Sequence, residues 1–525
     1  MQKYIKNLLL KIKCPFLFIS LAITIALCWI HCSIYWPGFI QDDAQTTYLL
    51  LKSGWHPVIM ADMVEMMYAL FGYHIWTLFV LTMFPFYVGV WVIVWAVYKK
   101  TKSWWSLLFF FPCFSGNIFF LLIKMGSSSF AASYLFLLWA LTLYVVFNKV
   151  ELKLLFYCFY SLIFIIALLG RHNAVIQVWS ALMVFIGMHL GKKSYSFWNY
   201  MWRFFALSFV SGIFTSLLFF GLNKALVRTD MGHVYPETLV TLHQIVGTCA
   251  PEMDESCFDI SWFTDEWQND PERMLNLKRK YENNLLDPEP FIIKSYEDLT
   301  GRQVTFRYHT DIKGRFSKLW YAVNKYPQNY ITHLKRFFKV AWHLPGDKIP
   351  REFLTHRYTR KGMVYHSSIW NPLSVREVAE QKYIAEQFPE EELSVKFSDF
   401  GRKADTFVRL HYPFYGIFYF VCTNFVLFAI GLILWLFTRN NTLNLYFMAV
   451  SCAGFLSNII IPLFCPRIFI RYMDPVIMCA VLSLVAFMLV LGQYRKLFTK
   501  YFRKCIKTKS FCLLFKKKRA KASGE

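Results

Sequence analysis

Residues 76–102 read WTLFVLTMFPFYVGVWVIVWAVYKKTK, in which an uncharged stretch, 76–98, precedes a cluster of three lysines. A membrane-spanning helix needs about 20 predominantly apolar residues, so this stretch is long enough to cross a bilayer. Hydrophobic residues make up 56% of the whole chain, well above the share in soluble domains. The sequence therefore predicts an all-α polytopic membrane protein with about ten transmembrane helices. The other nine expected spans are 15–35, 104–123, 128–147, 154–170, 174–191, 204–222, 412–438, 442–464 and 474–493.

The net charge of +24 lies outside the central part of the chain. Residues 225–410 hold 26 of the 57 basic residues and 26 of the 33 acidic residues, so this segment is neutral. The excess basic residues lie at both termini and in short loops after every second expected span, which is the positive-inside pattern. This distribution argues against a nucleic-acid partner. It predicts a bacterial inner (plasma) membrane protein whose N- and C-termini are both cytoplasmic.

The expected spans divide the chain into four parts. They are an N-terminal membrane domain with about seven spans (1–222), an extracytoplasmic domain (223–410), a C-terminal membrane segment with about three spans (411–493) and a basic cytoplasmic tail (494–525), which we expect to lie on the membrane surface.

Three features of the external segments lead to finer expectations. The first external loop, 36–75, is too long for a turn and contains no full span, so we expect amphipathic helices along the membrane surface. In the external domain, apolar residues at helical spacing over 316–344 predict two helices that are broken near Pro327. Cys249 and Cys257 could form a disulfide, but free buried thiols are the favoured interpretation.

Two adjacent acids, Asp42 and Asp43, follow the first expected span. Such a pair suits a general base or a ligand for a divalent cation such as Mg²⁺ or Mn²⁺. Aspartate is also a good N-cap, and the pair alone favours a cap for a surface helix. The metal requirement stays open at this point.

Basic residues at the expected outer ends of the spans change that balance. Each one alone is typical of a side chain that snorkels to the interface, but together they run against the positive-inside trend. Arginine and lysine recognise phosphate by charge and hydrogen-bonding geometry, so a bound phosphate is a natural explanation. These candidate donor-phosphate ligands are Lys124, Arg171, Arg467 and Arg471.

Four short motifs are spread over most of the chain. They are Trp36-Pro37-Gly38 with Asp43, Gly54 and His56-Pro57; Arg171-His172-Asn173-Ala174; Trp320 with Tyr326-Pro327 and Tyr330-Ile331; and, more weakly, Arg471-Tyr472 with Pro475. Through these motifs the chain resembles the integral-membrane glycosyltransferases of the C superfamily, which use polyprenyl-phosphate sugars, and most closely a poorly characterised bacterial branch. Where that branch has Ser after the acid and Gln four residues on, this chain has Ala44 and Thr47.

The resemblance implies that an acid in the first external loop is the catalytic base, which would be Asp43, with Asp42 as the second candidate. It also implies donor-phosphate contacts from the four basic residues at the outer ends of the spans. His56 could contact substrate or stiffen its turn. Asn173 could bind a sugar hydroxyl, although a cap for the next helix is favoured. Tyr472 completes the candidate substrate-binding residues.

These features predict an enzyme of cell-envelope polysaccharide biosynthesis. It would transfer a hexosyl or pentosyl group from a polyprenyl-phosphate donor to an extracytoplasmic saccharide or lipid acceptor. Two alternatives remain: a surface-polysaccharide polymerase or ligase that uses a polyprenyl-diphosphate donor, and a lipid-linked glycan transporter or flippase. The second alternative usually needs polar residues near the bilayer midplane, and the expected spans contain few.

Overall fold

The computed structural model describes the two membrane segments and much of the external domain. The described residues are 15–35, 39–40, 59–74, 76–122, 124–125, 127–148, 154–193, 195–226, 236–283, 306, 312–342, 403, 407, 410–411, 416–438, 441–464 and 473–507.

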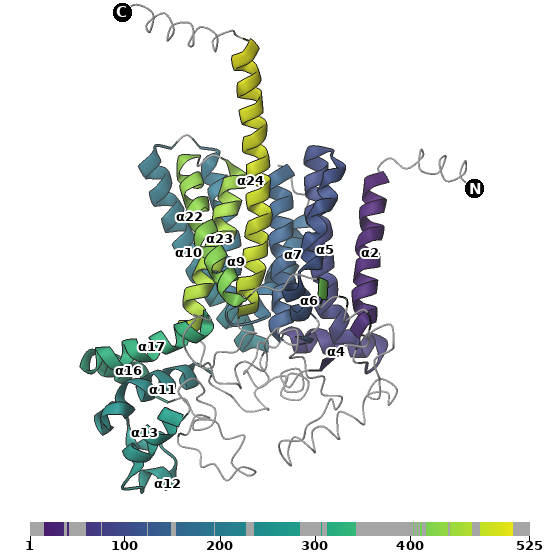
Figure 1. Cartoon of the computed structure of the whole chain (residues 1–525). Helices are drawn as coiled ribbons and strands as arrows, with labels where there is room; N and C mark the ends of the chain where they lie inside the picture. The colour runs from purple at the N-terminus through teal and green to yellow at the C-terminus, as the bar shows by residue number, and fades with distance from the viewer. Residues whose placement is uncertain are drawn as a thin grey trace, which may run out of the picture.

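Apolar helices that run side by side form a bundle (Figure 1). Within the described residues, eight of them are long and apolar enough to cross a membrane, which confirms an all-α, multi-pass membrane protein. These helices are α2 (Pro15–Tyr35), α5 (Trp76–Thr101), α7 (Ser127–Asn148), α9 (Ala174–Gly191), α10 (Phe197–Leu226), α22 (Ile417–Phe437), α23 (Thr442–Phe464) and α24 (Asp474–Lys507).

Two of the expected spans take shorter forms. Residues 104–123 do not form one α-helix, because a 3₁₀ helix, η1 (Trp104–Phe114), contains Pro112 and is followed by the short α6 (Gly116–Leu122). Proline has no backbone N–H and cannot continue an α-helical ladder. The other segment is α8 (Leu154–Leu169), whose 16 residues extend about 24 Å, less than the apolar thickness of a bilayer.

Both shorter segments nevertheless lead from one end of the bundle to the other. Trp104 packs edge-on against Phe16 at the start of α2. After α6 the chain forms β2 (Lys124–Met125), which pairs with β1 (Phe39–Ile40), and β1 follows the opposite end of α2. Helix α8 runs antiparallel along α7, since the Tyr160 hydroxyl lies 2.9 Å from the Thr142 hydroxyl and a Cβ atom on Gly170, just after α8, would lie 3.0 Å from that of Ala131.

Close helix contacts occur where small residues face a neighbouring backbone. A Cβ atom on Gly431 of α22 would lie 3.1 Å from the Cα atom of Met448 in α23. Polar ties add to this packing, since the Tyr446 hydroxyl donates to the Trp139 carbonyl oxygen at 3.1 Å. Lipid is as apolar as leucine, so such packing and hydrogen bonds, rather than apolar burial, hold membrane helices together.

The described part of the external domain is mostly helical and has its own apolar core, which includes Leu242, Trp262 and Phe306. A single antiparallel bridge joins Phe263 to Phe306. Its helices are α11 (Pro236–Cys249), η3 (Ala250–Glu252), η4 (Glu255–Cys257), η5 (Ile260–Trp262), α12 (Asp265–Gln268), α13 (Arg273–Asn283), α16 (Arg315–Lys325) and α17 (Pro327–Ala341).

Two expectations for this domain have opposite outcomes. The predicted pair of helices is confirmed, because α16 ends at Lys325 and Pro327 is the first residue of α17, a position where its missing N–H costs nothing. The preference for free thiols is wrong, because Cys249 and Cys257 form a disulfide. The cause is tertiary, since the chain turns back between the two residues, with Met253 in the left-handed conformation.

The external domain is attached to the bundle at the end of α23. The Gln244 side chain donates to the Leu463 carbonyl oxygen at 2.8 Å, and Trp342 Nε1 donates to the Asn458 carbonyl oxygen at 2.9 Å. The Trp342 ring also lies 5.6 Å from that of Phe425 in α22. The domain and the membrane segment are therefore joined by hydrogen bonds and aromatic packing as well as by the chain.

Two further segments bear on the sequence expectations. In the first external loop, the described residues contain one helix, α4 (Ile59–Phe71), and any second helix would lie outside them. At the other end of the chain, α24 continues past 493, the expected end of the last span, and reaches Lys507 without a break. The first part of the basic tail is thus a direct extension of the last helix, projecting beyond its neighbours (Figure 1).

Candidate functional site

The first external loop begins beside the segment that contains Lys124. Strands β1 and β2 pair in parallel, with Phe39 opposite Lys124 and Ile40 opposite Met125. Asp42 comes two residues after the end of β1. The backbone of the candidate phosphate ligand Lys124 therefore lies next to the strand that leads into the acidic pair, although 85 residues separate the two strands in sequence.

The strand β2 is held between two helices by buried contacts. The Ser129 hydroxyl, in the first turn of α7, donates to the Leu121 carbonyl oxygen near the end of α6 at 2.7 Å. On the other side of α7, a Cβ atom on Gly170 would lie 3.0 Å from the Cβ atom of Ala131. The turn between α8 and α9 thus packs against the first turns of α7, directly after β2.

This turn carries the second motif of the sequence analysis. Arg171 is only 5% exposed, while the neighbouring His172 is exposed and its ring lies 5.5 Å from that of Phe219 in α10. A buried guanidinium is costly unless a negative charge or hydrogen-bond acceptors surround it. The burial of Arg171 at the end of the bundle therefore requires acidic groups or hydrogen-bond acceptors around its side chain.

Asn173 occupies the N-cap position of α9, but its side chain makes no capping hydrogen bond, so the favoured capping role is wrong. Both polar atoms of this side chain are buried, and neither has a hydrogen-bond partner in the described part of the chain. Leaving a buried amide unsatisfied costs about 1–3 kcal/mol. An amide in this state is well suited to a polar partner that arrives from outside the bundle.

One acid that sequence analysis did not select lies at the same end of the bundle. Asp474 is the first residue of α24 and is fully buried. Two residues later, the Val476 carbonyl oxygen accepts from Asn424 of α22 at 3.0 Å, which places the start of α24 beside α22. The signal for Asp474 was present in the sequence, since it is the one acid within the ten expected spans.

The remaining candidates can be placed only in part. Lys124 is described by its backbone in β2, and nothing is described of its side chain. The candidates that lie outside the described residues are Asp42, Asp43, His56, Arg467, Arg471 and Tyr472.

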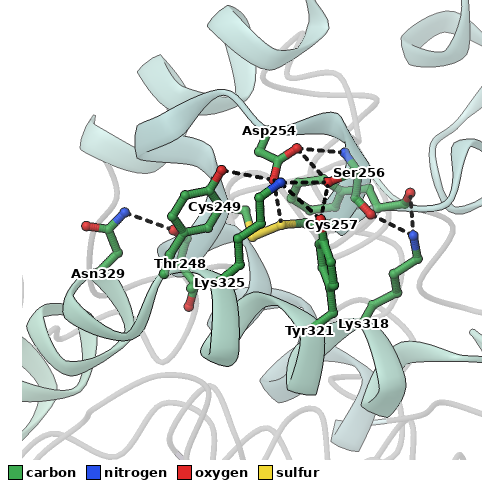
Figure 2. Close-up of polar contacts among 11 residues, drawn as sticks. Thr248, Cys249, Asp254, Ser256, Cys257, Lys318, Tyr321, Lys325 and Asn329 are labelled. Carbon is green, nitrogen blue, oxygen red and sulfur yellow. Dashed lines mark hydrogen bonds and ion pairs between the residues drawn. A yellow bond between two sulfur atoms is a disulfide. The ribbon is translucent and has the colours of Figure 1, made fainter.

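A separate polar cluster in the external domain surrounds Asp254 (Figure 2). Its carboxylate accepts from Lys325 Nζ at 2.7 Å, from the Ser256 hydroxyl at 2.7 Å and from the Tyr326 hydroxyl at 3.1 Å. The Cys257 sulfur, 3.6 Å away, donates no hydrogen bond because it belongs to the disulfide. These contacts tie the disulfide loop to the C-terminal end of α16.

The electrostatics of this cluster argue against a role as a general base. Burial by itself would raise the pKa of Asp254, but hydrogen bonds from Lys325, Ser256 and Tyr326 lower the pKa to about 2. A carboxylate with a pKa so far below neutral is a weak base. The cluster therefore has a structural role, since its hydrogen bonds hold parts of the domain together.

The described residues contain no group of three or more His, Cys, Asp or Glu side chains that could hold a metal ion. The acidic pair at Asp42 and Asp43 lies outside them, so a divalent cation stays a prediction. Comparison of the chain with known protein families, with curated proteins and with solved structures finds no match.

Proposed function

We propose that this protein is a membrane glycosyltransferase that moves a sugar from a polyprenyl-phosphate donor to an extracytoplasmic acceptor. The acceptor is a cell-surface glycan, a lipid-linked saccharide or a wall polymer. The observation that carries the proposal is the parallel pairing of β1 with β2. A phosphate-linked sugar donor requires acidic and basic groups that lie close together. The pairing supports such proximity between the first external loop and the segment that contains Lys124.

The surroundings of this pair support the same chemistry. Arg171 follows the Gly170 contact with α7, and Asn173 offers an amide donor and acceptor that no described residue engages. In the proposed reaction, the Asp43 carboxylate takes the proton of an acceptor hydroxyl, whose oxygen bonds to the anomeric carbon of the sugar. The bond from that carbon to the phosphate oxygen breaks, and Lys124, Arg171, Arg467 and Arg471 stabilise the departing lipid phosphate.

The proposal includes ten crossings of a bacterial inner membrane, with the site on the extracytoplasmic side. It counts η1 with α6 and α8 as crossings, because each connects opposite ends of the bundle. The Cys249–Cys257 disulfide supports an oxidising compartment for the external domain. The positive-inside pattern assigns both termini to the cytoplasm.

The acid can be tested with the purified full-length protein and polyprenyl-phosphate sugars. We expect Asp43→Asn, or the double variant with Asp42→Asn, to slow sugar transfer about 10²- to 10⁴-fold, the usual contribution of a general base. Glu65→Gln is the matched control, since Glu65 is an exposed acid on α4 in the same external loop. It should transfer sugar at the rate of the unmodified protein.

Other outcomes identify the alternatives. Full transfer by the double variant would exclude the proposed base. Transfer that requires a polyprenyl-diphosphate donor would instead support a polymerase or ligase. Uptake of a lipid-linked glycan into sealed vesicles without covalent change would support a transporter.

A further inference from the structure

Helices α16 and α17 present two apolar faces, of which the domain core covers only one. The covered face packs on α11, where Ala322 and His333 are buried and Asn329 donates to the Thr248 carbonyl oxygen at 3.2 Å. The second face has an apolar residue every three or four positions within each helix, starting at Phe316 in α16, and it resumes at Ile331 after the break at Pro327. We call it the α16–α17 stripe, and its residues are Phe316, Trp320, Val323, Ile331, Leu334 and Phe338.

Three large apolar side chains of this stripe are exposed. Phe316 is 63% exposed, Trp320 70% and Ile331 42%. A contiguous row of large apolar side chains on the outside of a protein usually marks an interaction surface. The contacts at its far end indicate what that surface meets.

The stripe runs into the surface of the membrane bundle. The Phe338 ring lies 5.1 Å from that of Trp342, and Trp342 packs against Phe425 of α22. On α22, apolar side chains such as Tyr419 and Val426 are 64% and 56% exposed, as expected for a face in contact with lipid. The stripe is therefore continuous with a lipid-facing surface.

The arrangement in space agrees with this continuity. Figure 1 shows α17 and α16 running sideways from the end of the bundle, with α11 and α13 on the side away from it. The stripe lies to one side of the face that packs on α11, and its end at Phe338 reaches the end of the bundle through Trp342, the level at which the bundle meets lipid headgroups. Lys335 and Lys339 lie beside the stripe in α17, about a quarter of a turn around the helix.

We propose that the α16–α17 stripe rests in the outer leaflet of the membrane and holds the external domain against it. An amphipathic helix of this kind buries its aromatic and aliphatic face at the headgroup boundary, while neighbouring lysines contact anionic phospholipid. This inference rests on the membrane orientation proposed above, in which the external domain is extracytoplasmic. It does not rest on the proposed sugar transfer.

A photocrosslinking experiment on the full-length chain tests the lipid contact. Trp320 is replaced by p-benzoylphenylalanine, the protein is reconstituted into vesicles of phosphatidylethanolamine and phosphatidylglycerol, and lipid adducts are quantified by mass spectrometry after irradiation. Ser317 is the matched control, since it is exposed on the same helix but lies off the stripe. Val426 on α22 is the positive reference.

We expect the adduct yield at Trp320 to approach that at Val426 and to exceed that at Ser317 several-fold. Placing the crosslinker at Phe316 repeats the test at a second exposed position, and an intact Cys249–Cys257 disulfide shows that each variant has folded. A yield at both stripe positions no higher than at Ser317 would overturn the proposal. Adducts to a second protein chain in place of lipid would also overturn it.

Discussion

At the scale of single residues, the two most informative side chains are buried and polar. The Asn173 amide, at the end of the bundle, has no hydrogen-bond partner among the described residues, whereas the Asn424 amide nitrogen donates a hydrogen bond that joins α22 to α24. His333 lies in the external domain, where its Nδ1 atom is 2.8 Å from the Tyr281 hydroxyl. Asn173 leads to a prediction in which stability and function respond differently, and His333 leads to a prediction about pH.

Asn173→Leu separates binding from folding. This buried amide makes no hydrogen bond to any described residue, so its removal relieves a desolvation cost and we expect thermal stability in detergent micelles to hold or to rise slightly. Sugar transfer should nevertheless fall, because the amide contributes to the proposed site. Asn424→Leu is the control with the opposite pattern, since it removes a hydrogen bond worth about 1 kcal/mol. A loss of stability in Asn173→Leu without a loss of transfer would indicate a structural role.

His333 should make the stability of the external domain depend on pH. Burial, with a smaller contribution from the nearby Arg336, lowers the pKa of His333 to about 3. In the unfolded chain a histidine takes up a proton below about pH 6.5, whereas the folded chain resists it until about pH 3. Stability is therefore fully present above pH 6.5 and is lost progressively as the pH falls toward 3.

Urea titrations of the full chain between pH 7 and pH 4, followed by proteolysis of the external domain, measure this effect. We expect the midpoint to fall with pH, and to fall less in His333→Gln, which cannot take up the proton. Asp254 adds to the slope only near the acid end of this range, because an unfolded aspartate takes up a proton at about pH 3.9 whereas folded Asp254 does so at about pH 2. Equal slopes for the two proteins would show that His333 is not the group responsible.

At the scale of elements, Gly431 lets α22 and α23 approach each other closely because it has no side chain. A Cβ atom on Gly431 would meet the Met448 backbone, which cannot rotate away as a side chain can. Gly221 in α10 is also helical but has no atom within 4 Å of its would-be Cβ. The two positions therefore make a matched pair.

Gly431→Ala should destabilise the bundle, by about 1–3 kcal/mol if the helices must shift to admit the methyl group. Gly221→Ala should instead stabilise its helix by up to about 1 kcal/mol, because alanine is the better helix former. Thermal unfolding in micelles compares both variants with the unmodified protein. A stabilising effect at both positions would mean that α22 and α23 do not approach as closely as described.

At the scale of the whole molecule, the chain combines a membrane bundle with an external domain attached at the end of α23. Figure 1 shows that α2 begins and α24 ends at the same end of the bundle, opposite the external domain. The proposed ten crossings place the excess positive charge and the disulfide domain on opposite sides of the membrane. This arrangement can be measured without any assumption about catalysis.

In sealed right-side-out vesicles, we expect an external protease to cleave within the domain that contains α11 to α17 and to leave epitope tags at both termini intact. Inverted vesicles should show the reverse, since the termini are then exposed to the protease. Detergent-permeabilised vesicles, in which every site is accessible, serve as the control. Cleavage of a single terminal tag in right-side-out vesicles would mean an odd number of crossings.

The sequence by itself determined the fold class and most of the membrane helices. A helix in lipid satisfies its backbone hydrogen bonds internally, so length and apolar composition are sufficient signals for each span. The break at Pro327 was predictable for a similarly local reason. The prediction of one helix over 104–123 was less successful, because composition counts apolar residues and gives little weight to Pro112.

Only the tertiary structure decided how the candidate site is assembled. Three features depend on how separate segments meet: the pairing of β1 with the backbone of Lys124, the burial of Asp474 and the Asn173 amide, which no described residue engages. The Cys249–Cys257 disulfide depends on the turn at Met253 between its two cysteines. Hydrophobic patterning is a property of neighbouring residues and carries no information about such contacts. The sequence could therefore propose which residues belong to a site, while the packing of the helix ends determines which of them lie together.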